Sequence, residues 1–241
     1  MIVVLDNQDS FVYNLVSQFE ELGHEVRVMR NTVRADDVLE ANPDLVCLSP
    51  GPGAPADAGC LLELTARCVG NVPVLGICLG FQALIEVAGG RVGPVGAVHG
   101  KSQELQLTAA GMRDPVFRSC QGQPIELSVA RYHSLGTRTL PDSLTPLATI
   151  DGIVMAARWD NQPAVGLQFH PESVLTLRGM EMMRDTLESL LGAGGTPADS
   201  GTAPGAGGTP ADSGTASRTS APPSTETPNR ATVAKPLRNQ S

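Results

Sequence analysis

Residues 72–82 constrain the fold more than any other segment of the chain. They read Val-Pro-Val-Leu-Gly-Ile-Cys-Leu-Gly-Phe-Gln. The apolar run that ends at Ile77 is typical of a buried strand, and residues 81–88 carry apolar side chains at helical spacing. Cys78 therefore stands where a strand turns sharply into a helix, between small glycines, a pattern known as a nucleophile elbow. A helix start stabilises a thiolate, although a buried structural cysteine is the common alternative.

A second strand-like run, residues 164–169, ends in the triplet His170-Pro171-Glu172. Proline fixes its own backbone angle and favours an extended conformation for the residue before it. Side chains two positions apart in an extended chain point to the same side, so Glu172 can orient the imidazole of His170 and favour its charged form. The chain thus offers a nucleophile, a base and an orienting acid in the order Cys, His, Glu, which favours a catalytic interpretation.

A Pro-Gly turn at residues 48–53, Leu-Ser-Pro-Gly-Pro-Gly, follows the strand-like residues 44–48. Its prolines have no backbone N–H, whereas Gly51 and Gly53 do. Backbone donors that are already in place can stabilise the negative oxygen that forms on an attacked carbonyl. The amide of Gly51 is expected to act together with that of Leu79, which follows the nucleophile. Taken alone, a Pro-Gly cluster indicates only a loop.

Together with three further motifs, these segments resemble the class I glutamine amidotransferases. The resemblance covers roughly the first four-fifths of the chain, and its motifs occur in a fixed order that chance agreement would not produce. They are residues 5–11 (LDNQDSF), 48–53, 76–82, 98–101 (VHGK), 131–135 (RYHSL) and 168–173.

The resemblance implies roles for individual residues. Cys78 is the implied nucleophile, and His170 and Glu172 complete the triad. Gly51 and Leu79 are the implied backbone donors of an oxyanion hole. The residues implied to line the pocket for L-glutamine are Pro50, Gly51, Pro52, Leu79, Gln82, Ser134 and Leu135. Phe81 departs from the family, which often has histidine there; since phenylalanine cannot shuttle protons, we expect Phe81 to serve packing.

Within the family, the chain is most similar to the glutaminase subunits of anthranilate synthase, in tryptophan synthesis, and of 4-amino-4-deoxychorismate synthase, in folate synthesis. This similarity implies that the chain hydrolyses L-glutamine and delivers ammonia to a separate, large chorismate-binding synthase subunit. No cofactor or metal is expected in this chain, and magnesium would belong to the partner. The motifs do not separate the tryptophan role from the folate role or from service to both.

Two other classes of function stay open. The chain could be a stand-alone cysteine hydrolase of γ-glutamyl compounds or peptides, which Gln82 and the Ser134-Leu135 pair disfavour. Strong glutaminase turnover without a partner would favour it. The chain could also be a non-catalytic binding module, which the presence of Cys78, His170 and Glu172 disfavours. Failure of Cys78 to react with a glutamine-like electrophile would support that alternative.

Strand-like and helix-like segments alternate in the first half of the chain. This alternation predicts an α/β fold with a mostly parallel central sheet and helices on both faces, and the resemblance implies a flavodoxin-like, three-layer version of it. Ligands bind such sheets at the carboxyl ends of the strands, where the loops at Asp6, Ser49 and Cys78 should meet. From residue 91 to residue 169 the strands become shorter and predict antiparallel pieces around the sheet. The predicted strands are residues 2–5, 25–29, 44–48, 72–77, 104–107, 125–129, 147–150, 153–157 and 164–169, and the predicted helices are residues 10–22, 35–41, 59–68, 81–88 and 178–191.

Composition excludes several classes of partner. The chain has 241 residues and a formal net charge of −8, which disfavours nucleic acid as the main partner. The sequence contains no apolar stretch long enough to span a membrane and begins directly with a strand, so neither a membrane span nor a signal peptide is expected. The five cysteines are odd in number and form no Cys-x-x-Cys pair, so neither a disulfide framework nor a zinc site is expected. A cytoplasmic location fits this pattern.

The end of the chain has a different composition. Residues 192–203 read GAGGTPADSGTA, and residues 205–216 repeat them without change. The remainder is rich in Thr, Ser, Pro and Ala, and such a segment cannot bury enough apolar surface to offset its ordering entropy. We therefore expect a glutamine amidotransferase domain over residues 1–191 and a disordered tail over residues 192–241.

Other titratable residues receive less specific interpretations. His133 is the only rival to His170 as the base, and it lacks an obvious carboxylate partner. Asp6 and Asp9 could suggest a metal site, but their loop offers no further ligand cluster, so we expect them to cap a helix.

Overall fold

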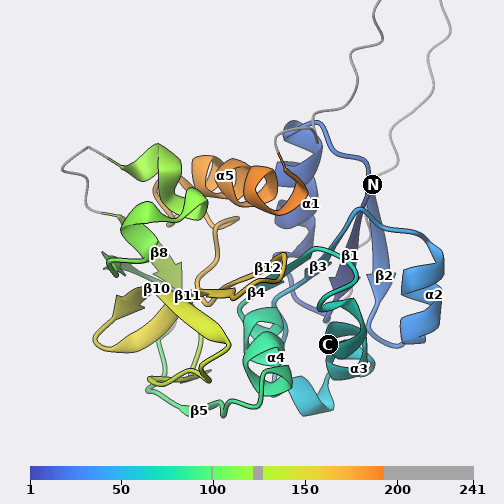
Figure 1. The fold of residues 1–241 in the computed structure, drawn as a ribbon, viewed down its shortest axis with the longest axis horizontal. Coiled ribbons are helices and arrows are strands. Elements are labelled where there is room, and N and C mark those ends of the chain that lie inside the picture. The colour runs from blue at the N-terminus through green and yellow to red at the C-terminus, as the bar shows by residue number, and fades with distance from the viewer. Residues whose placement is uncertain (99, 122–126, 193–241) are drawn as a thin grey trace, which may run out of the picture. The chain divides into compact units, whose positions relative to one another are not determined.

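An eight-stranded sheet forms the centre of the computed structural model, which describes residues 1–98, 100–121 and 127–192 (Figure 1). Its strand order is β2-β1-β3-β4-β12-β11-β10-β7. The first five strands in this order, from β2 to β12, pair in parallel. Strands β11, β10 and β7 extend the sheet by antiparallel pairing. The strands are β1 (Ile2–Asp6), β2 (Val26–Arg30), β3 (Leu45–Leu48), β4 (Val74–Ile77), β7 (Gln106–Leu107), β10 (Leu144–Ile150), β11 (Ile153–Trp159) and β12 (Ala164–Leu167).

Two short ladders and a set of helices surround this sheet. The ladders pair β5 (Gly93–Pro94) with β9 (Leu135–Gly136) and β6 (Lys101–Glu104) with β8 (Ser128–Arg131). The α-helices are α1 (Val12–Glu21), α2 (Ala35–Glu40), α3 (Leu61–Cys68), α4 (Leu79–Val87) and α5 (Gly179–Leu191), and the 3-10 helices are η1 (Pro55–Asp57), η2 (Gly111–Arg113) and η3 (Pro115–Cys120).

Helices cover both faces of the sheet, with α1 and α5 on one side and α3 and α4 on the other (Figure 1). Strand β1 shows how the sequence produces this arrangement. Its side chains alternate between faces, so that Ile2 and Val4 join the apolar cluster of α1 and α5, whereas Val3 and Leu5 join the cluster of α3 and α4. A strand that is apolar on both faces is typical of a parallel sheet buried between helix layers. The predicted three-layer α/β fold is thereby confirmed.

The predicted helices are all present, with ends that differ by at most two residues from those expected. The prediction for residues 164–169 was wrong in one respect. Strand β12 is not an antiparallel piece beside the sheet but a central strand that pairs in parallel with β4, with Leu167 opposite Ile77. All four of its residues are buried, which is the pattern of a strand covered on both faces. Likewise, β10 and β11 continue the main sheet instead of lying around it.

Two smaller predictions also need correction. The single strand predicted over residues 104–107 is divided between β6 and β7, which belong to different sheets. The chain divides at Leu105, which is buried and donates its N–H to the carbonyl of Leu127 at 2.7 Å. Cys120, expected in a loop, ends η3 and is buried. Part of the predicted strand 125–129 lies outside the described residues, and β8 begins at Ser128.

Three glycines allow α4 to approach the sheet at backbone distance. A Cβ atom at Gly80 would lie 2.2 Å from the carbonyl oxygen of Leu48 in β3, and one at Gly76 would lie 2.6 Å from the carbonyl oxygen of Gly80. A Cβ atom at Gly166 in β12 would lie 1.9 Å from Cδ2 of Phe81. Phe81 is fully buried, so its ring fills the space above Gly166. The expectation that Phe81 serves packing is confirmed.

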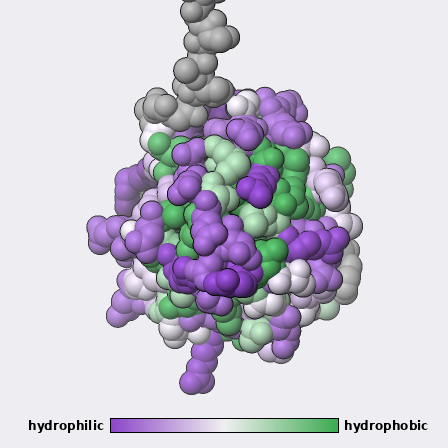
Figure 2. Space-filling view, turned by 90° about the vertical axis from the view of Figure 1, so that its right-hand side faces the viewer, coloured by the Kyte–Doolittle hydropathy of each residue, from purple (hydrophilic) through white to green (hydrophobic). Residues whose placement is uncertain are grey.

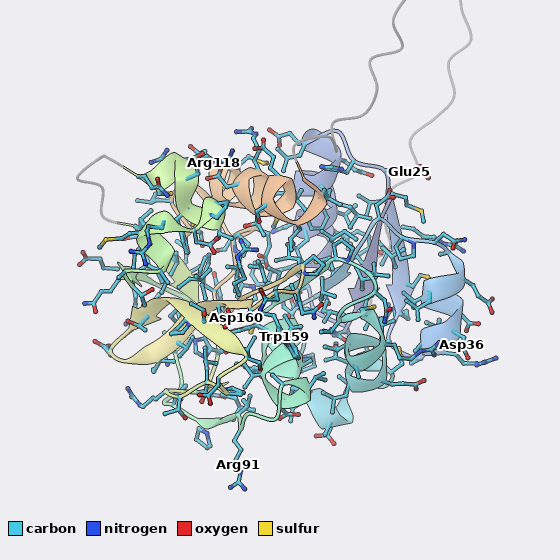
Figure 3. All side chains as sticks on the ribbon, viewed as in Figure 1. Glu25, Asp36, Arg91, Arg118, Trp159 and Asp160 are labelled. Atoms are coloured by element: carbon cyan, nitrogen blue, oxygen red, sulfur yellow. The ribbon has the colours of Figure 1, made fainter. Side chains whose placement is uncertain are left out.

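Helix α5 is attached to η3 by polar contacts. The carboxylate of Asp185 accepts hydrogen bonds from the backbone N–H of Ser119 at 2.7 Å and from its hydroxyl at 3.0 Å. The guanidinium of Arg118, which is labelled in Figure 3, lies 3.1 Å from the carboxylate of Glu188 on the exposed side of this contact. These contacts hold the last helix of the domain against the segment that precedes β8.

The edge strand β2 carries exposed charged side chains. Figure 2, which views this side of the molecule, shows hydrophilic side chains interspersed with apolar ones. Arg27 and Arg30 of β2 are exposed, as is Val28, and charged side chains on an edge strand discourage pairing with another chain. Among the described helices, none combines the length and the apolar character that crossing a membrane requires. The tail predicted over residues 192–241 lies outside the described residues, apart from Gly192.

Candidate active site

Four segments that the sequence singled out lie at the carboxyl ends of four neighbouring parallel strands. Asn7 follows β1, Ser49 follows β3, Cys78 follows β4, and His170 lies three residues beyond the end of β12. This edge is where open α/β sheets bind ligands. Loops after β1, β3 and β4 were expected to meet here, and the central position of β12 adds the His-Pro-Glu segment to the same edge.

Cys78 occupies the sharp turn between β4 and α4. Its backbone angles are φ 51° and ψ −100°, and a positive φ is uncommon for residues other than glycine. Such strained conformations concentrate at functional sites. The N–H of Cys78 donates to the carbonyl of Leu167 at 2.8 Å, which ties the turn to β12. The predicted strand-turn-helix elbow with Cys78 at the turn is therefore present.

His170 lies between Cys78 and Glu172. Its Nδ1 atom is 2.7 Å from Oε1 of Glu172, and both side chains are almost completely buried. Burial lowers the pKa of His170. The hydrogen bonds that its ring donates to Cys78 and Glu172, together with the attraction of their negative charge, outweigh burial and raise the pKa to about 10. The surroundings of His170 thus favour an imidazolium ion that has an acceptor on each side.

Two aromatic rings pack against the imidazole of His170. The ring of Phe11 has its centroid 5.5 Å away, and that of Tyr132 lies 5.1 Å away, both in edge-on orientations. The hydroxyl of Tyr132 is in turn 3.3 Å from that of Ser173. These contacts fix the ring plane and place three distant segments of the chain around one side chain.

The Pro-Gly turn after β3 lies against the start of α4. A Cβ atom at Gly51 would come within 2.7 Å of Leu79 Cδ2 and of Asn7 Cβ, so only glycine fits there. Leu79 begins α4, and the first amides of a helix have no partner within the helix. Asn7 holds the turn in place, because its backbone N–H and its side-chain amide donate to Oγ and O of Ser49, both at 2.9 Å. Gly51 and Leu79, the two predicted donors, are therefore brought together.

The residues predicted to line a glutamine pocket are only partly gathered by direct contacts. Gln82 is buried, and its Nε2 donates to the carbonyl of Leu135 at 3.0 Å. Ser134 is exposed beside Leu135. In the turn after β3, Pro50 is buried and Pro52 is exposed.

Gln168 begins the motif at residues 168–173, but the sequence assigned it no role in the site. Its Nε2 atom lies 3.6 Å from the sulfur of Cys78, and its side chain is fully buried. The signal was a glutamine at the end of the otherwise apolar run at residues 164–169. A polar side chain that ends a buried strand needs a partner, and here part of that requirement is met by the sulfur.

His133, the rival candidate for the base, has different neighbours. Its Nδ1 lies 2.7 Å from the carbonyl oxygen of Leu135, and Arg131 donates to its Nε2 at 3.1 Å. Burial lowers the pKa of His133 to about 4, so this imidazole is neutral. The carboxylate Glu172 is bonded to His170 instead, which agrees with the preference stated from the sequence.

The five cysteines are all free thiols in this structure. Cys78 keeps 8% of its surface accessible, whereas Cys47 and Cys68 keep none. Burial raises the pKa of Cys47, assisted by the negative charge of Glu172, and burial raises the pKa of Cys68 to about 12. These two thiols are therefore unreactive packing residues at neutral pH.

The acidic residues of the first loop bind the backbone. Asp9 accepts a hydrogen bond from the N–H of Phe11, the N-cap of α1, at 2.8 Å, whereas Asp6 accepts one from Gln8 at 2.7 Å within the loop. Helix α1 has no side-chain cap, so the capping role expected of Asp6 and Asp9 was wrong, and both carboxylates stabilise the loop that precedes the helix. Within residues 1–98, 100–121 and 127–192, no three His, Cys, Asp or Glu side chains are grouped in a way that could hold a metal ion.

Comparison with known proteins agrees with this architecture. Residues 3–190 match the family described as glutamine amidotransferase class-I. Anthranilate synthase component 2 from Corynebacterium glutamicum is 48% identical over 203 residues, which cover 79% of this chain and 98% of the relative. Aminodeoxychorismate/anthranilate synthase component 2 from Bacillus subtilis is 39% identical over 198 residues, covering 78% of this chain and 96% of the relative.

A solved structure gives the same result for the fold. A glutamine amidotransferase from Thermotoga maritima superposes with a TM-score of 0.64 at 19% identity, covering 79% of this chain and 97% of that one. The family match, the two relatives and the elbow at Cys78 agree with each other. The chain belongs to the class I glutamine amidotransferases.

Proposed function

We propose that the chain is the glutaminase subunit of an anthranilate synthase, which hydrolyses L-glutamine and passes ammonia to a separate chorismate-binding synthase subunit. The contact of His170 with both Cys78 and Glu172 at the strand edge carries the chemical part of this proposal. The names of the relatives support the pathway, because component 2 requires a component 1. Such a chain would act in the cytoplasm and would itself need no cofactor, with any magnesium bound by the partner.

In the first half of the proposed reaction, the Cys78 thiolate attacks the side-chain amide carbon of glutamine. Negative charge develops on the carbonyl oxygen, and the backbone amides of Gly51 and Leu79 donate to it. The imidazolium of His170 gives its proton to the leaving nitrogen, and ammonia departs from the thioester. A pKa of about 10 keeps this proton on His170 at neutral pH until the leaving group accepts it.

In the second half, the neutral His170 takes a proton from water, and the water attacks the thioester. Collapse of the second tetrahedral intermediate releases glutamate and restores the thiolate-imidazolium pair. Glu172 does not touch substrate in this scheme. It holds Nδ1 of His170 at 2.7 Å, and so aims Nε2 toward the sulfur and stabilises the positive ring.

The pocket for glutamine would be built around the same turn. Gln82, Ser134 and Leu135, with the turn at residues 50–52, are proposed to surround the substrate. Gln82 is buried against Leu135, so it can present its remaining polar atom without movement of α4. A preformed site of this kind lowers the ordering cost of binding a small, polar substrate.

The decisive experiment combines Cys78→Ser with two nitrogen sources. The partner and the variant should make no anthranilate from glutamine but should keep synthesis from added ammonia, because Cys78 serves only amide hydrolysis. Loss of both activities would mean that Cys78 is structural or that the complex does not form. Strong wild-type glutaminase turnover without any partner would favour a stand-alone hydrolase.

Service to 4-amino-4-deoxychorismate synthase is the second candidate function. The Bacillus subtilis relative carries both activities in its name, so one chain of this type can be named for two partners. Affinity purification of the tagged chain from cell extract, followed by mass spectrometry, identifies the large subunit or subunits that bind it. Recovery of only the folate-pathway subunit would overturn the tryptophan assignment.

A further inference from the structure

A continuous series of hydrogen bonds between buried groups leads from Arg131 to the nucleophile. The bond between Arg131 and His133 shows which group donates and which accepts. A guanidinium has donors only, so Nε2 of His133, at 3.1 Å from Nε of Arg131, must be the acceptor. The proton of the neutral His133 ring then sits on Nδ1, which donates to the carbonyl oxygen of Leu135 at 2.7 Å. Burial, which lowers the pKa of His133 to about 4, keeps the ring in this neutral form.

The carbonyl of Leu135 fixes the orientation of the next amide. A carbonyl oxygen can only accept, so Gln82 must present its NH₂ group, which it does at 3.0 Å. The second N–H of this group points to Oε1 of Gln168 at 3.4 Å. Gln82 therefore determines which end of the Gln168 amide it faces.

Gln168 has no freedom to rotate its amide by half a turn. Its oxygen faces the donor of Gln82, so its NH₂ group faces the sulfur of Cys78, at 3.6 Å from Nε2 to Sγ. Gln168 is fully buried, and no water is needed to complete the link. The backbone carbonyl of Leu135 and the side chains of Gln82 and Gln168 thus decide that the sulfur meets a hydrogen-bond donor and not an acceptor.

We propose that Gln168 is a further catalytic residue, whose side-chain amide donates to the Cys78 thiolate, and that Gln82 is the positioning residue that holds this amide in its donating orientation. The proposal rests on the proposed role of Cys78 as nucleophile. A donor that faces the sulfur stabilises the thiolate relative to the thiol, because hydrogen bonds to charged groups are stronger than those to neutral groups.

Gln168 acts beside His170 and not in place of it. His170 supplies and recovers the proton, while Gln168 remains bonded to the sulfur without any change of protonation. Since Gln82 is also proposed to contact glutamine, binding of substrate and orientation of the donor would share one side chain. This arrangement explains why the nucleophile turn and the loop at residues 133–135 meet, although they are far apart in the sequence.

The test measures the rate at which iodoacetamide alkylates Cys78 as a function of pH. The sulfur forms a bond to the methylene carbon and iodide leaves, so the reaction needs the thiolate but neither the glutamine pocket nor the oxyanion hole. In Gln168→Met, the midpoint of the rate against pH should move upward by about one pH unit, which is the effect expected from loss of one hydrogen bond to a charged acceptor. Gln168→Glu has almost the same shape and should shift the midpoint further, because it places a second negative charge at the sulfur.

A double-mutant cycle tests the positioning role of Gln82. Gln82→Met alone should raise the midpoint by roughly half a pH unit, because the amide of Gln168 is then free to turn. In the Gln168→Met background the same substitution should have no further effect. Gln18→Met is the matched control, since Gln18 donates to the Pro171 carbonyl at 3.1 Å beside the triad but does not contact the sulfur. Its midpoint should equal that of the wild type.

Each outcome separates this proposal from the function on which it rests. If wild-type Cys78 does not react with iodoacetamide, the nucleophile assignment fails. If wild-type Cys78 reacts, and folded Gln168→Met and Gln168→Glu keep the wild-type midpoint, then Gln168 only fills space and the proposal is wrong. Equal effects of Gln82→Met in both backgrounds would remove the positioning role. Circular dichroism establishes that each variant is folded.

Discussion

The contact between Gly166 and Phe81 should dominate the stability of the layer formed by α4. Gly166 lies directly beneath the Phe81 ring, and a Cβ atom there would be 1.9 Å from Cδ2. Both residues are buried, and Gly76 and Gly80 already place α4 at backbone distance from β3 and β4, so little space is left between the helix and the sheet. Gly166→Ala must therefore displace the ring or the helix.

The expected magnitudes follow from this geometry. Inserting one methyl group into a packed core usually destabilises by about 1–3 kcal/mol, and the severity of this overlap favours the upper end, about 3 kcal/mol. Phe81→Leu alone should destabilise by about 1–2 kcal/mol, since it removes part of a buried ring. Independent effects would sum to about 4–5 kcal/mol. Because Leu leaves room for the new methyl group, we expect the double variant to lose only about 2–3 kcal/mol.

Urea unfolding, followed by circular dichroism and by the fluorescence of Trp159, the single tryptophan, measures these free energies. Gly93→Ala is the control, because Gly93 also lies in a strand but has no atom within 4 Å of the position that a Cβ atom would take. It should change stability by less than about 0.5 kcal/mol. Additive effects of Gly166→Ala and Phe81→Leu would refute the packing explanation of Phe81.

Three further predictions concern the site and the tail. Glutamine hydrolysis, measured as glutamate release, should persist across neutral pH and fall as the pH rises through about 10, because the imidazolium of His170 is then lost; burial alone would lower the pKa of His170. Glu172→Gln should move this alkaline fall in rate to lower pH. It should also reduce turnover about ten- to a thousandfold, with nearly unchanged glutamine affinity. One equivalent of iodoacetamide at neutral pH should label Cys78 and spare Cys68, whose pKa burial raises to about 12, and peptide mass spectrometry locates the label. Truncation after Leu191 should leave the melting temperature and the glutamine-dependent rate unchanged, because the family match ends at residue 190 and the remaining sequence is a polar repeat; a large drop in either would contradict this.

The sequence was sufficient for those parts of the fold that local patterns determine. Residues 72–82 contain a buried strand, a strained turn and a helix start in one continuous segment, so the order of residues alone places Cys78 at an elbow. The triplet His170-Pro171-Glu172 was predicted to be extended, but in the structure residues 170–173 form a turn, closed by a hydrogen bond from the N–H of Ser173 to the carbonyl of His170 at 3.2 Å. The predicted pairing of His170 with Glu172 is present at 2.7 Å, but it is made across this turn and not along an extended strand.

The parts that the sequence left unresolved depend on pairing between distant segments. Nothing local distinguishes β12 as a parallel neighbour of β4 from an antiparallel strand at the edge, since both read as short apolar runs. The role of Gln168 is hidden for the same reason, because its partner Gln82 is 86 residues away, and Gln82 is itself oriented by Leu135, from which it is separated by 53 residues. The amide orientation that turns Gln168 toward Cys78 exists only once all three segments have met.

The position of β12 explains how one sheet edge can assemble the whole site. Strands β4 and β12 are parallel and in register, with Leu167 opposite Ile77, so the residues that follow them leave the sheet side by side. Cys78 turns into α4 immediately, and its N–H bonds to Leu167, whereas the other strand continues through Gln168 to His170. An antiparallel β12 would send its carboxyl end to the opposite edge and place His170 a full strand length from the sulfur. Parallel pairing at this one position is therefore the structural condition for contact between Cys78 and His170.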